Sequence, residues 1–441
     1  MLRYFIKTFG CKVNQVESDE LNTALKDRGA QSVECVDSAD FIIVNTCTVT
    51  GEADRKVRKE LRRYLRLTAT GAIIVTGCTA VLRKAELEAL GSKIKVFADK
   101  NEILEYVQNI SNKKSEIPSY TPNQSSDFDD VDSAEIQTSN LVPSTMTQRI
   151  RIPLKVQDGC ESFCSYCIVP YARGLCNSVP ADDIIKRAQS LVAVGTKEII
   201  LTGINLGNYC DTGTDKDSGT KNLAQLIRQI QEETDLHRLR LSSIEPLHVT
   251  DDLLELLAEG TLLCEHLHIP LQSGSDYVLG EMNRNYSTSE YLEVVEKIRK
   301  ANPKTAITTD IIVAYPSEDD DDFGQTMKLV KEVGFAKIHV FRYSTREGTA
   351  AAKLKPLDPR LVKERAKRLQ KQADMDALRY LNSRKGSRLE LVVEDVNGDD
   401  RTIIGTSREY LRLELSADAL NLDGRSEGKS LKPGELIHTI L

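Results

Sequence analysis

The segment that decides the fold is RIRIPLKVQDGCESFCSYC, residues 149–167. Its first nine residues alternate polar with apolar side chains, a period-two pattern that predicts a β-strand. Three cysteines, Cys160, Cys164 and Cys167, follow directly after this strand. Downstream, five further apolar runs alternate with amphipathic helical patterns. Six strand–helix units in succession predict a partial (βα)6 barrel, whose functional side chains lie at the carboxyl ends of the strands.

The predicted barrel domain covers residues 149–381. Its predicted strands are residues 149–157, 198–202, 237–243, 266–270, 306–313 and 338–343. Helical spacing is found over residues 180–194, 223–232, 251–258, 287–300 and 320–333, and a long polar helix over residues 359–381 leads out of the domain.

The clustered cysteines predict metal chemistry. Three thiolates within eight residues can hold one side of a compact soft-metal centre. A structural zinc site takes four ligands, usually as two Cys-x-x-Cys pairs, and the nearest further thiol, Cys176, has no such pairing. Three protein ligands on a four-iron cluster leave one iron open for a reactant. A zinc knuckle or incidental thiols are the alternative interpretation.

Residues 1–111 also alternate apolar runs, at residues 2–8, 41–47, 72–77 and 94–98, with helical patterns at residues 17–27 and 54–67. This alternation predicts an α/β domain with a doubly wound parallel sheet. Cys11, Cys47 and Cys78 each follow or end one of its first three strands. Because the carboxyl ends of parallel strands share one edge, a second three-cysteine cluster is predicted, with unrelated free thiols as the alternative. The remaining cysteines are interpreted as packed thiols: Cys35, Cys176, Cys210 and Cys264.

Residues 112–148 are polar, acidic and poor in aliphatic side chains, which predicts an acidic linker or mobile loop. The last part of the chain, residues 382–441, alternates apolar and polar residues between Gly and Asp turns. Its predicted strands, residues 388–393, 402–404, 410–415 and 435–440, favour a small antiparallel β-barrel.

The composition narrows the class of protein. A chain of 441 residues has length for about three domains, and no apolar run approaches the roughly 18 residues of a membrane helix. The N-terminus lacks the pattern of a secretory signal, so a cytoplasmic protein without a membrane partner is expected. Ten cysteines in such a chain favour metal or redox chemistry over disulfides.

A net charge of −7 argues at first against a nucleic-acid partner, but the charge is uneven. Residues 55–66 hold seven bases and one acid, and residues 358–385 hold nine bases and four acids. Such stretches can neutralise phosphates, or they are solvated helix faces. The C-terminal region carries eight bases and eleven acids from Lys385 onward, so RNA binding there would depend on shape and hydrogen bonds. Tyr410 either stacks on a base or belongs to the core of the small barrel.

The motif Cys-x-x-x-Cys-x-aromatic-Cys after the first strand of a barrel resembles the signature of the radical S-adenosylmethionine (SAM) superfamily. Both cysteine triplets, in this order, resemble the methylthiotransferase branch of that superfamily. So do the strings GCKVNQVES at residues 10–18, NTCTV at 45–49, QSGS at 272–275 and MNR at 282–284. The C-terminal barrel resembles the TRAM domain, an RNA-binding module of the oligonucleotide-binding-barrel type. The resemblance covers nearly the whole chain except the linker.

The resemblance implies two [4Fe-4S] clusters, held by the two triplets, and SAM as the second cofactor. It implies that Tyr166 lies against the adenine of SAM, and that the turns after the second and third barrel strands line the SAM site. The implied cofactor-binding residues are Tyr166, Gly203, Asn205, Ser243, Glu245 and Gln272. Glu245 could equally be a solvated loop carboxylate. No catalytic side chain beyond the cluster ligands is implied.

Within the branch, KVN at residues 12–14 and TVTGEAD at residues 48–54 look most like the enzymes that act on N6-threonylcarbamoyladenosine in tRNA. The implied reaction adds a methylthio group to C2 of that base, next to the anticodon. One SAM methylates a sulfur, and a second SAM supplies the 5′-deoxyadenosyl radical. The implied partners are tRNA and a flavodoxin- or ferredoxin-like reductant, with no DNA.

Two alternatives stay open. The same chemistry could act on isopentenyladenosine or on a ribosomal-protein aspartate, or the chain could be a non-catalytic metal- or RNA-binding protein. The sequence also departs from the family pattern at LCNS (residues 175–178), at AYPSE (314–318) and around Arg342. None of these departures removes a predicted cysteine ligand.

Overall fold

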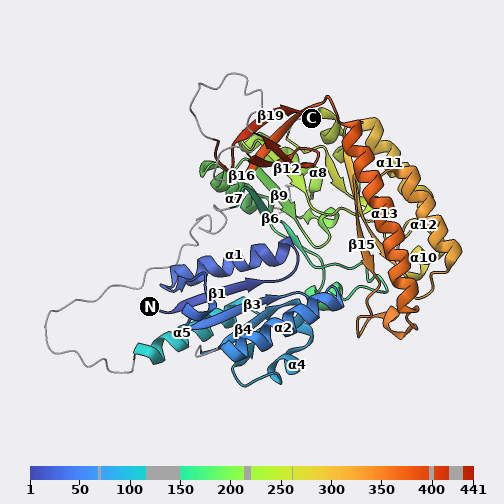
Figure 1. Ribbon diagram of the computed structural model, residues 1–441. Coiled ribbons are helices and arrows are strands. Elements are labelled where there is room, and N and C mark those ends of the chain that lie inside the picture. Colours follow the sequence, from blue (N-terminus) through green and yellow to red (C-terminus); the bar gives the residue numbers. More distant parts are fainter. Residues whose placement is uncertain (68–70, 116–148, 213–219, 261, 397–401, 417–430) are drawn as a thin grey trace, which may run out of the picture.

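The computed structural model describes residues 1–67, 71–115, 149–212, 220–260, 262–396, 402–416 and 431–441. These residues form an N-terminal parallel sheet, a central set of parallel strands and a small antiparallel sheet (Figure 1). The predicted linker lies outside the described residues from residue 116 onward. Helix α5 (Lys100–Ser115) crosses the predicted domain boundary at residue 111.

The N-terminal sheet is parallel throughout, in the order β2-β1-β3-β4-β5. Its strands are β1 (Arg3–Thr8), β2 (Gln31–Ser32), β3 (Phe41–Thr46), β4 (Ile73–Gly77) and β5 (Ile94–Val96). Along β3, Ile42 and Val44 pack on the face that α2 (Gly51–Leu67) covers, whereas Phe41 and Ile43 pack on the opposite face. Burial on both faces explains why the strands read as continuous apolar runs.

Helix α1 (Lys12–Asp27) begins at Lys12 instead of the predicted residue 17, because Val13 and Val16 are already buried at helical spacing. The sequence did not predict β2 or α5. Strand β2 consists of two exposed residues, which are too few to show an alternating pattern. Helix α5 buries only a few side chains, among them Ile103 and Val107. The remaining short elements are η1 (Val36–Ser38), α3 (Cys78–Leu82) and α4 (Lys84–Glu88).

The central domain has six parallel strands. They are β6 (Arg151–Lys155), β9 (Glu198–Thr202), β12 (Arg238–Leu241), β13 (His266–His268), β14 (Ala306–Val313) and β15 (Lys337–Arg342). Two three-stranded sheets, β12-β9-β6 and β13-β14-β15, are joined by the bridges Leu239–Leu263 and Ser243–His268. The six strands therefore follow one another in chain order. Val16 of α1 belongs to their core, and α1 packs beside β6.

Helices surround these strands (Figure 1). They are α6 (Val169–Arg173), α7 (Ala181–Ala193), α8 (Leu223–Glu233), α9 (Asp251–Glu259), α10 (Asp276–Glu281), α11 (Thr288–Ala301), α12 (Asp320–Val333) and α13 (Pro359–Ser383). Minor elements are β7 (Gln157–Asp158), β8 (Asn177–Ser178), β10 (Cys210–Asp211), β11 (Lys221–Asn222), η3 (Leu206–Asn208), η4 (Pro246–His248) and η5 (Ala350–Lys353). No helix among the described residues is long and apolar enough to cross a membrane.

The C-terminal sheet is antiparallel, in the order β18-β17-β16-β19. Its strands are β16 (Arg388–Val396), β17 (Thr402–Ser407), β18 (Arg412–Ser416) and β19 (Leu436–Ile440). Tyr410, in the turn before β18, packs on the His266 ring with a centroid distance of 4.6 Å. The guanidinium groups of Arg151 and Arg240 lie 5.3 and 4.9 Å from the Tyr410 ring. Tyr410 is thus a contact between this sheet and the central domain.

Candidate functional site

The first cysteine triplet lies at one edge of the N-terminal sheet. Cys11 is the residue before α1, Cys47 follows β3, and Cys78 opens α3 directly after β4. Strands β1, β3 and β4 are neighbours, so their carboxyl ends lie side by side. Gly10 has a φ of +114°, and a Cβ added there would lie 2.8 Å from Cys47 Cβ, so only glycine allows this close approach.

A buried amide pair holds the loop that carries Cys11. The Cys11 thiol donates to Asn14 Oδ1 at 3.2 Å, and Asn14 Nδ2 donates to Asn45 Oδ1 at 3.0 Å. Burial raises the pKa of Cys47 to about 11, and burial also raises the pKa of Cys78 although Arg173 opposes it. These thiols are protonated near neutral pH, so metal binding would release their protons.

The second triplet lies in the loop between β7 and α6. The loop is folded back on itself, since Cys160 N donates to Gly174 O at 3.1 Å and Cys167 N donates to Cys164 O at 2.9 Å. Burial raises the pKa of Cys167 to about 12 and also raises that of Cys164. The loop therefore carries three thiols beyond the carboxyl end of β6, the first strand of the central domain.

The sulfur atoms of each triplet do not form a tight group of three. In the described part of the chain, the three sulfur atoms of neither triplet all lie within 4.8 Å of one another. A single tetrahedral zinc ion, with Zn–S bonds of about 2.3 Å, would bring its sulfur ligands to within about 3.8 Å. Neither triplet therefore forms the close set of three sulfur ligands that a single zinc ion requires.

An arginine lies against each triplet, and neither arginine was among the predicted site residues. Arg173, at the end of α6, donates from Nε to Cys78 Sγ at 3.2 Å and pairs with Glu17 of α1. Arg284 donates from Nη1 to Cys164 Sγ at 3.1 Å and pairs with Glu245. Arg173 thereby joins the central domain to the cysteine edge of the N-terminal sheet. Its only sequence signal is its position six residues after Cys167.

A cavity of about 250 Å³ opens beside the second triplet. Its walls are formed by Glu161, Ser162, Cys164, Asn205, Asn208, Glu245, Leu247, His248, Asn283, Arg284, Asn285 and Tyr286. Asn205 Oδ1 and His248 Nδ1 are buried and have no hydrogen-bond partner among the described residues. A cavity with orphaned polar atoms beside three thiols is suited to a polar ligand.

Two of the six residues predicted to bind the second cofactor, Asn205 and Glu245, line this cavity. Gly203 leaves room for the side chain of Gln157, because a Cβ at position 203 would lie 2.8 Å from Gln157 Oε1. That oxygen accepts a hydrogen bond from the backbone N–H of Asn205, a cavity residue, at 2.8 Å. Tyr166 packs beside the buried group of Val278, Met282, Tyr315 and Ala351. Ser243 and Gln272 are not among the lining residues, and Gln272 has a φ of +64°.

A further set of polar groups lies on the strands of the central domain, where no sequence pattern had indicated it. His268, Asp310 and His339, on β13, β14 and β15, place their ligand atoms within 4.8 Å of one another. His268 Nε2 lies 3.2 Å from Asp310 Oδ1, and His268 Nδ1 lies 2.9 Å from Thr308 Oγ1. Only the alignment of three adjacent parallel strands brings these residues together.

The interpretation of the other four cysteines is partly wrong. Cys264 is fully buried, as expected of a packed thiol, but Cys35 and Cys210 are exposed. Cys176 is half-buried, and its sulfur accepts a long contact of 3.6 Å from Asn208 Nδ2.

The structure shows strained backbone at one of the departures from the family pattern, AYPSE at residues 314–318. Its first residue, Ala314, has a φ of +59°, a region that favours glycine. Its backbone N–H donates to Glu318 Oε1 at 2.9 Å, which holds this turn.

Comparison with known proteins agrees with this architecture. Residues 154–330 match the family model "Radical SAM superfamily", and residues 3–99 match "Uncharacterized protein family UPF0004". Among solved structures, the radical SAM methyltransferase TsrM from Kitasatospora setae is similar, with a TM-score of 0.52 over 77% of this chain and 73% of that chain. At 14% identity this likeness concerns the fold.

Curated relatives extend over nearly the whole chain. The threonylcarbamoyladenosine tRNA methylthiotransferase MtaB of Bacillus subtilis is 35% identical over 413 residues, which cover 92% of this chain and 88% of the relative. The tRNA-2-methylthio-N(6)-dimethylallyladenosine synthase of Syntrophus aciditrophicus is 32% identical, over 88% and 83%. With matches of this extent, and with a cysteine triplet in each of two matched domains, the chain belongs to the MtaB-type radical SAM methylthiotransferase family of enzymes.

Proposed function

We propose that this transferase adds a methylthio group to C2 of N6-threonylcarbamoyladenosine, next to the anticodon of a tRNA. Membership of the radical SAM superfamily implies SAM and one [4Fe-4S] cluster. In the proposed reaction, one SAM is used to methylate a sulfur, and a second SAM supplies the 5′-deoxyadenosyl radical. A flavodoxin- or ferredoxin-like reductant supplies the electron. Because the proposed substrate is a tRNA, the proposed location of the enzyme is the cytoplasm.

The observation that carries the proposal is the pair of cysteine triplets on facing domains. Cys160, Cys164 and Cys167 are proposed to hold the cluster that binds SAM. Cys11, Cys47 and Cys78 are proposed to hold a second [4Fe-4S] cluster. Contacts between α3, which Cys78 opens, and α6, which follows Cys167, support this arrangement. Such a pair of centres can face one base from two sides.

The cavity beside Cys164 is the proposed SAM site. Asn205 and Glu245 line it, and Gly203 leaves room for the turn behind them. Tyr166, Ser243 and Gln272 remain proposed SAM contacts, on the strength of the family resemblance. The charged and amide groups of the cavity wall can bind the amine, carboxylate and ribose of SAM. In this proposal the protein orients SAM and excludes water from it.

We further propose that the C-terminal sheet is part of a TRAM-type barrel, that the six central strands form the partial barrel of the superfamily, and that the domains are residues 1–111, 149–381 and 382–441. The antiparallel order β18-β17-β16-β19 and the chain-order sequence of the six strands support this.

The proposed base is chosen from the names of the relatives and from two loop strings. Relatives named for threonylcarbamoyladenosine and for dimethylallyladenosine both match most of the chain. Three of the relatives, each 35% identical to this chain, are named for threonylcarbamoyladenosine, and the loop strings at residues 12–14 and 48–54 support the same base. Isopentenyladenosine is the main alternative.

Nucleoside mass spectrometry tests the base directly. We expect tRNA from cells that lack this protein to lose the methylthio group from threonylcarbamoyladenosine and to keep it on isopentenyladenosine. Expression of the chain should restore the first nucleoside, and the Cys164→Ala variant should not. Loss of the methylthio group from isopentenyladenosine alone would refute the proposed base.

Arg284 provides a test of the SAM site. Its planar guanidinium contacts both Cys164 and Glu245, and a lysine ammonium cannot reproduce this two-sided geometry. We expect Arg284→Lys to weaken SAM binding about tenfold, equivalent to about 1.4 kcal/mol, measured by equilibrium dialysis with the iron-loaded protein. Arg228→Lys, on a surface paired with Glu255 and Glu259, is the control and should leave affinity unchanged. Equal affinities for both variants would contradict this site.

A further inference from the structure

We infer that a basic groove along α2 binds the phosphate backbone of the RNA substrate and guides it to the cysteine edge of the N-terminal sheet. The groove has a volume of about 600 Å³ and is lined by Gly51, Asp54, Arg55, Arg58, Lys59, Arg62, Arg66, Arg83 and Arg346. This inference rests on the proposed function, since it names the surface by which that RNA is held.

The groove results from the helical spacing of basic residues along α2. Arg55, Arg58, Lys59, Arg62 and Arg66 recur at intervals of three and four residues, so they lie on one side of α2. From Arg55 to Arg66 the helix rises about 16 Å, a length that spans several phosphates of one strand. The opposite side of α2 is apolar and packs on the sheet through Val57, Leu61 and Tyr64.

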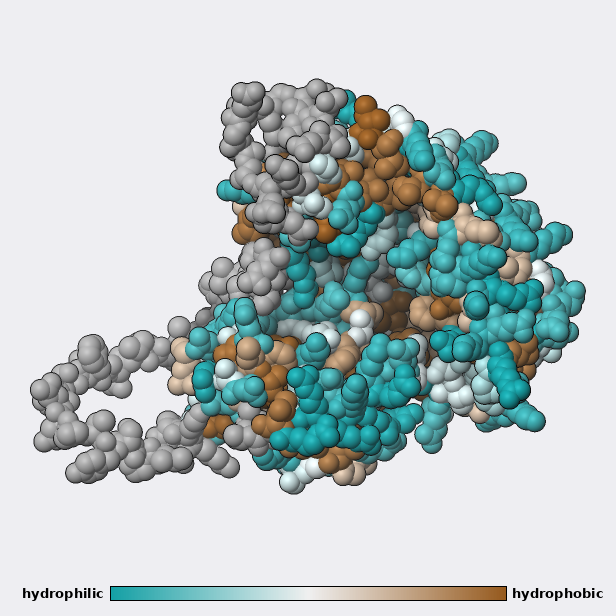
Figure 2. Space-filling model, viewed as in Figure 1, coloured by the Kyte–Doolittle hydropathy of each residue, from teal (hydrophilic) through white to brown (hydrophobic). Residues whose placement is uncertain are grey.

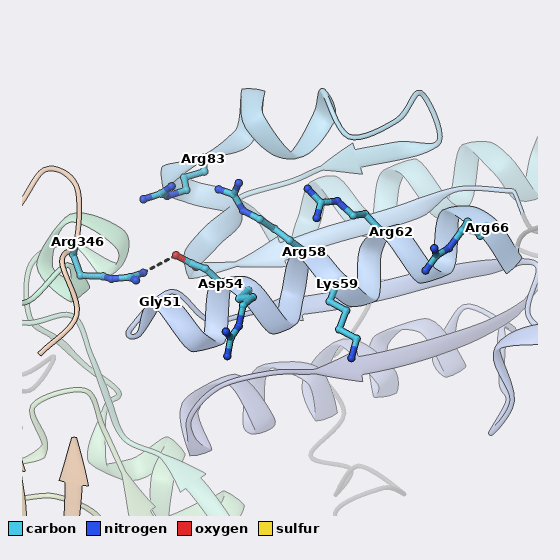
Figure 3. Close-up of a pocket in the computed structure, with 9 residues that line it drawn as sticks. Gly51, Asp54, Arg58, Lys59, Arg62, Arg66, Arg83 and Arg346 are labelled. Carbon is cyan, nitrogen blue, oxygen red and sulfur yellow. Dashed lines mark hydrogen bonds and ion pairs between the residues drawn. The ribbon is translucent and has the colours of Figure 1, made fainter. Parts of the chain in front are cut away.

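Tertiary structure adds cations from two other segments. Figure 3 shows Arg58 and Arg62 reaching from α2 towards the side where Arg83 lies, with Arg346 at the start of the helix. Arg346 comes from the loop after β15 and pairs with Asp54 at 2.6 Å. The surface over α2 is hydrophilic in the space-filling view (Figure 2).

Several of these cations have no hydrogen-bond or ion-pair partner in the part of the chain that the structure describes. Arg58 and Arg83 share Glu86, and Arg346 is held by Asp54. Within the described residues, no hydrogen bond or ion pair engages the exposed side chains of four others: Arg55, Lys59, Arg62 and Arg66. Positive charges that lie side by side without ion pairs repel one another, and a polyanion removes that repulsion.

One end of the groove lies next to the first cysteine triplet. Arg346 Nη1 donates to Thr48 O at 3.1 Å, and Thr48 is the residue after Cys47. The groove therefore starts beside the first cysteine triplet and runs outward along α2. Its lining contains no aromatic ring, so it suits contacts with phosphates and not base stacking.

The second basic stretch of the sequence, on α13, is a weaker candidate. Arg365 is buried and bound to Glu318 and Asp320, and Arg379 pairs with Asp376, so part of its positive charge is compensated.

Salt-dependent binding tests the inference. The iron-loaded full chain is titrated with a labelled tRNA transcript, and fluorescence anisotropy gives the affinity between 50 and about 300 mM KCl. If Arg55 and Arg62 each neutralise one phosphate, Arg55→Gln/Arg62→Gln should lower the slope of log affinity against log salt by about 1.4–1.8. At 100 mM salt we expect affinity to fall about tenfold or more.

The control removes two exposed charges far from the groove, Lys328→Gln/Lys331→Gln on α12, and should bind as the wild type does. Circular dichroism and iron content check that both variants are folded. If the wild type binds tRNA and the groove variant keeps its slope and affinity, the groove inference is overturned while the proposed function stands. If the wild type does not bind tRNA at all, both are overturned.

Discussion

Cys47→Ala is expected to abolish methylthio transfer while SAM is still cleaved reductively, whereas Cys164→Ala is expected to abolish both. The reason is the separation of the two triplets: Cys47 lies at the edge of the N-terminal sheet, and Cys164 lines the cavity proposed for SAM. Each variant should retain about four irons and four sulfides per chain, against about eight of each in the wild type. Anaerobic metal and sulfide analysis and 5′-deoxyadenosine release measure these outcomes.

Cys35→Ala and Cys210→Ala are matched controls, because both thiols are exposed and lie outside the triplets. They should keep full iron content and full activity. Stoichiometric zinc in the wild type would rule out the two-cluster proposal. Full modification of tRNA by the Cys47 and Cys164 variants would also rule it out.

Glu198→Gln is expected to destabilise the junction between the central domain and the C-terminal sheet by about 3–5 kcal/mol. Glu198 is fully buried and accepts from Arg238 Nε at 3.0 Å and Arg240 Nε at 2.7 Å. The same guanidinium groups donate to the carbonyl oxygens of Thr406 and Ser407, so the carboxylate holds the donors that dock the sheet. The amide would leave the buried Arg240 guanidinium without its carboxylate partner, and the buried Arg238 guanidinium with Glu390 alone, at 3.5 Å. Thermal unfolding and limited proteolysis after α13 measure the loss.

The acid dependence of stability gives a second measurement. Burial alone would raise the pKa of Glu198, but Arg240 and Arg238 lower it to about 2, against about 4.3 in an unfolded chain. The stabilisation is therefore complete above pH of about 4.3 and is lost as the pH falls towards 2. Glu198→Gln should lack this contribution to the acid dependence. The control Glu255→Gln removes a surface pair with Arg228 and should cost less than about 1 kcal/mol; an equal loss in both variants would contradict the role of Glu198.

The sequence alone determined the features that repeat locally along the chain. Strand–helix alternation follows from apolar periodicity, which a strand or helix expresses within a few residues, so β3, β9 and β14 were predicted closely. Cys160, Cys164 and Cys167 could be grouped because they lie within eight residues. The other three ligand cysteines could be grouped because parallel strands place their carboxyl ends at one edge. Family strings around Asn14 and Asn45 marked a loop whose buried amide pair holds Cys11.

Tertiary structure decided what depends on segments distant in sequence. Arg173 reaches Cys78 and Arg346 reaches Asp54 across the junction of two domains, and neither position carries a local pattern. The same holds for the set formed by His268, Asp310 and His339, which exists only because three strands are aligned. Helix spacing could indicate that α2 is basic, but a groove needs Arg83 and Arg346 brought to it by the fold. Electrostatic contacts act over a few ångströms in space, whatever the number of residues that separate the groups along the chain. The order of residues in the sequence therefore could not reveal these contacts.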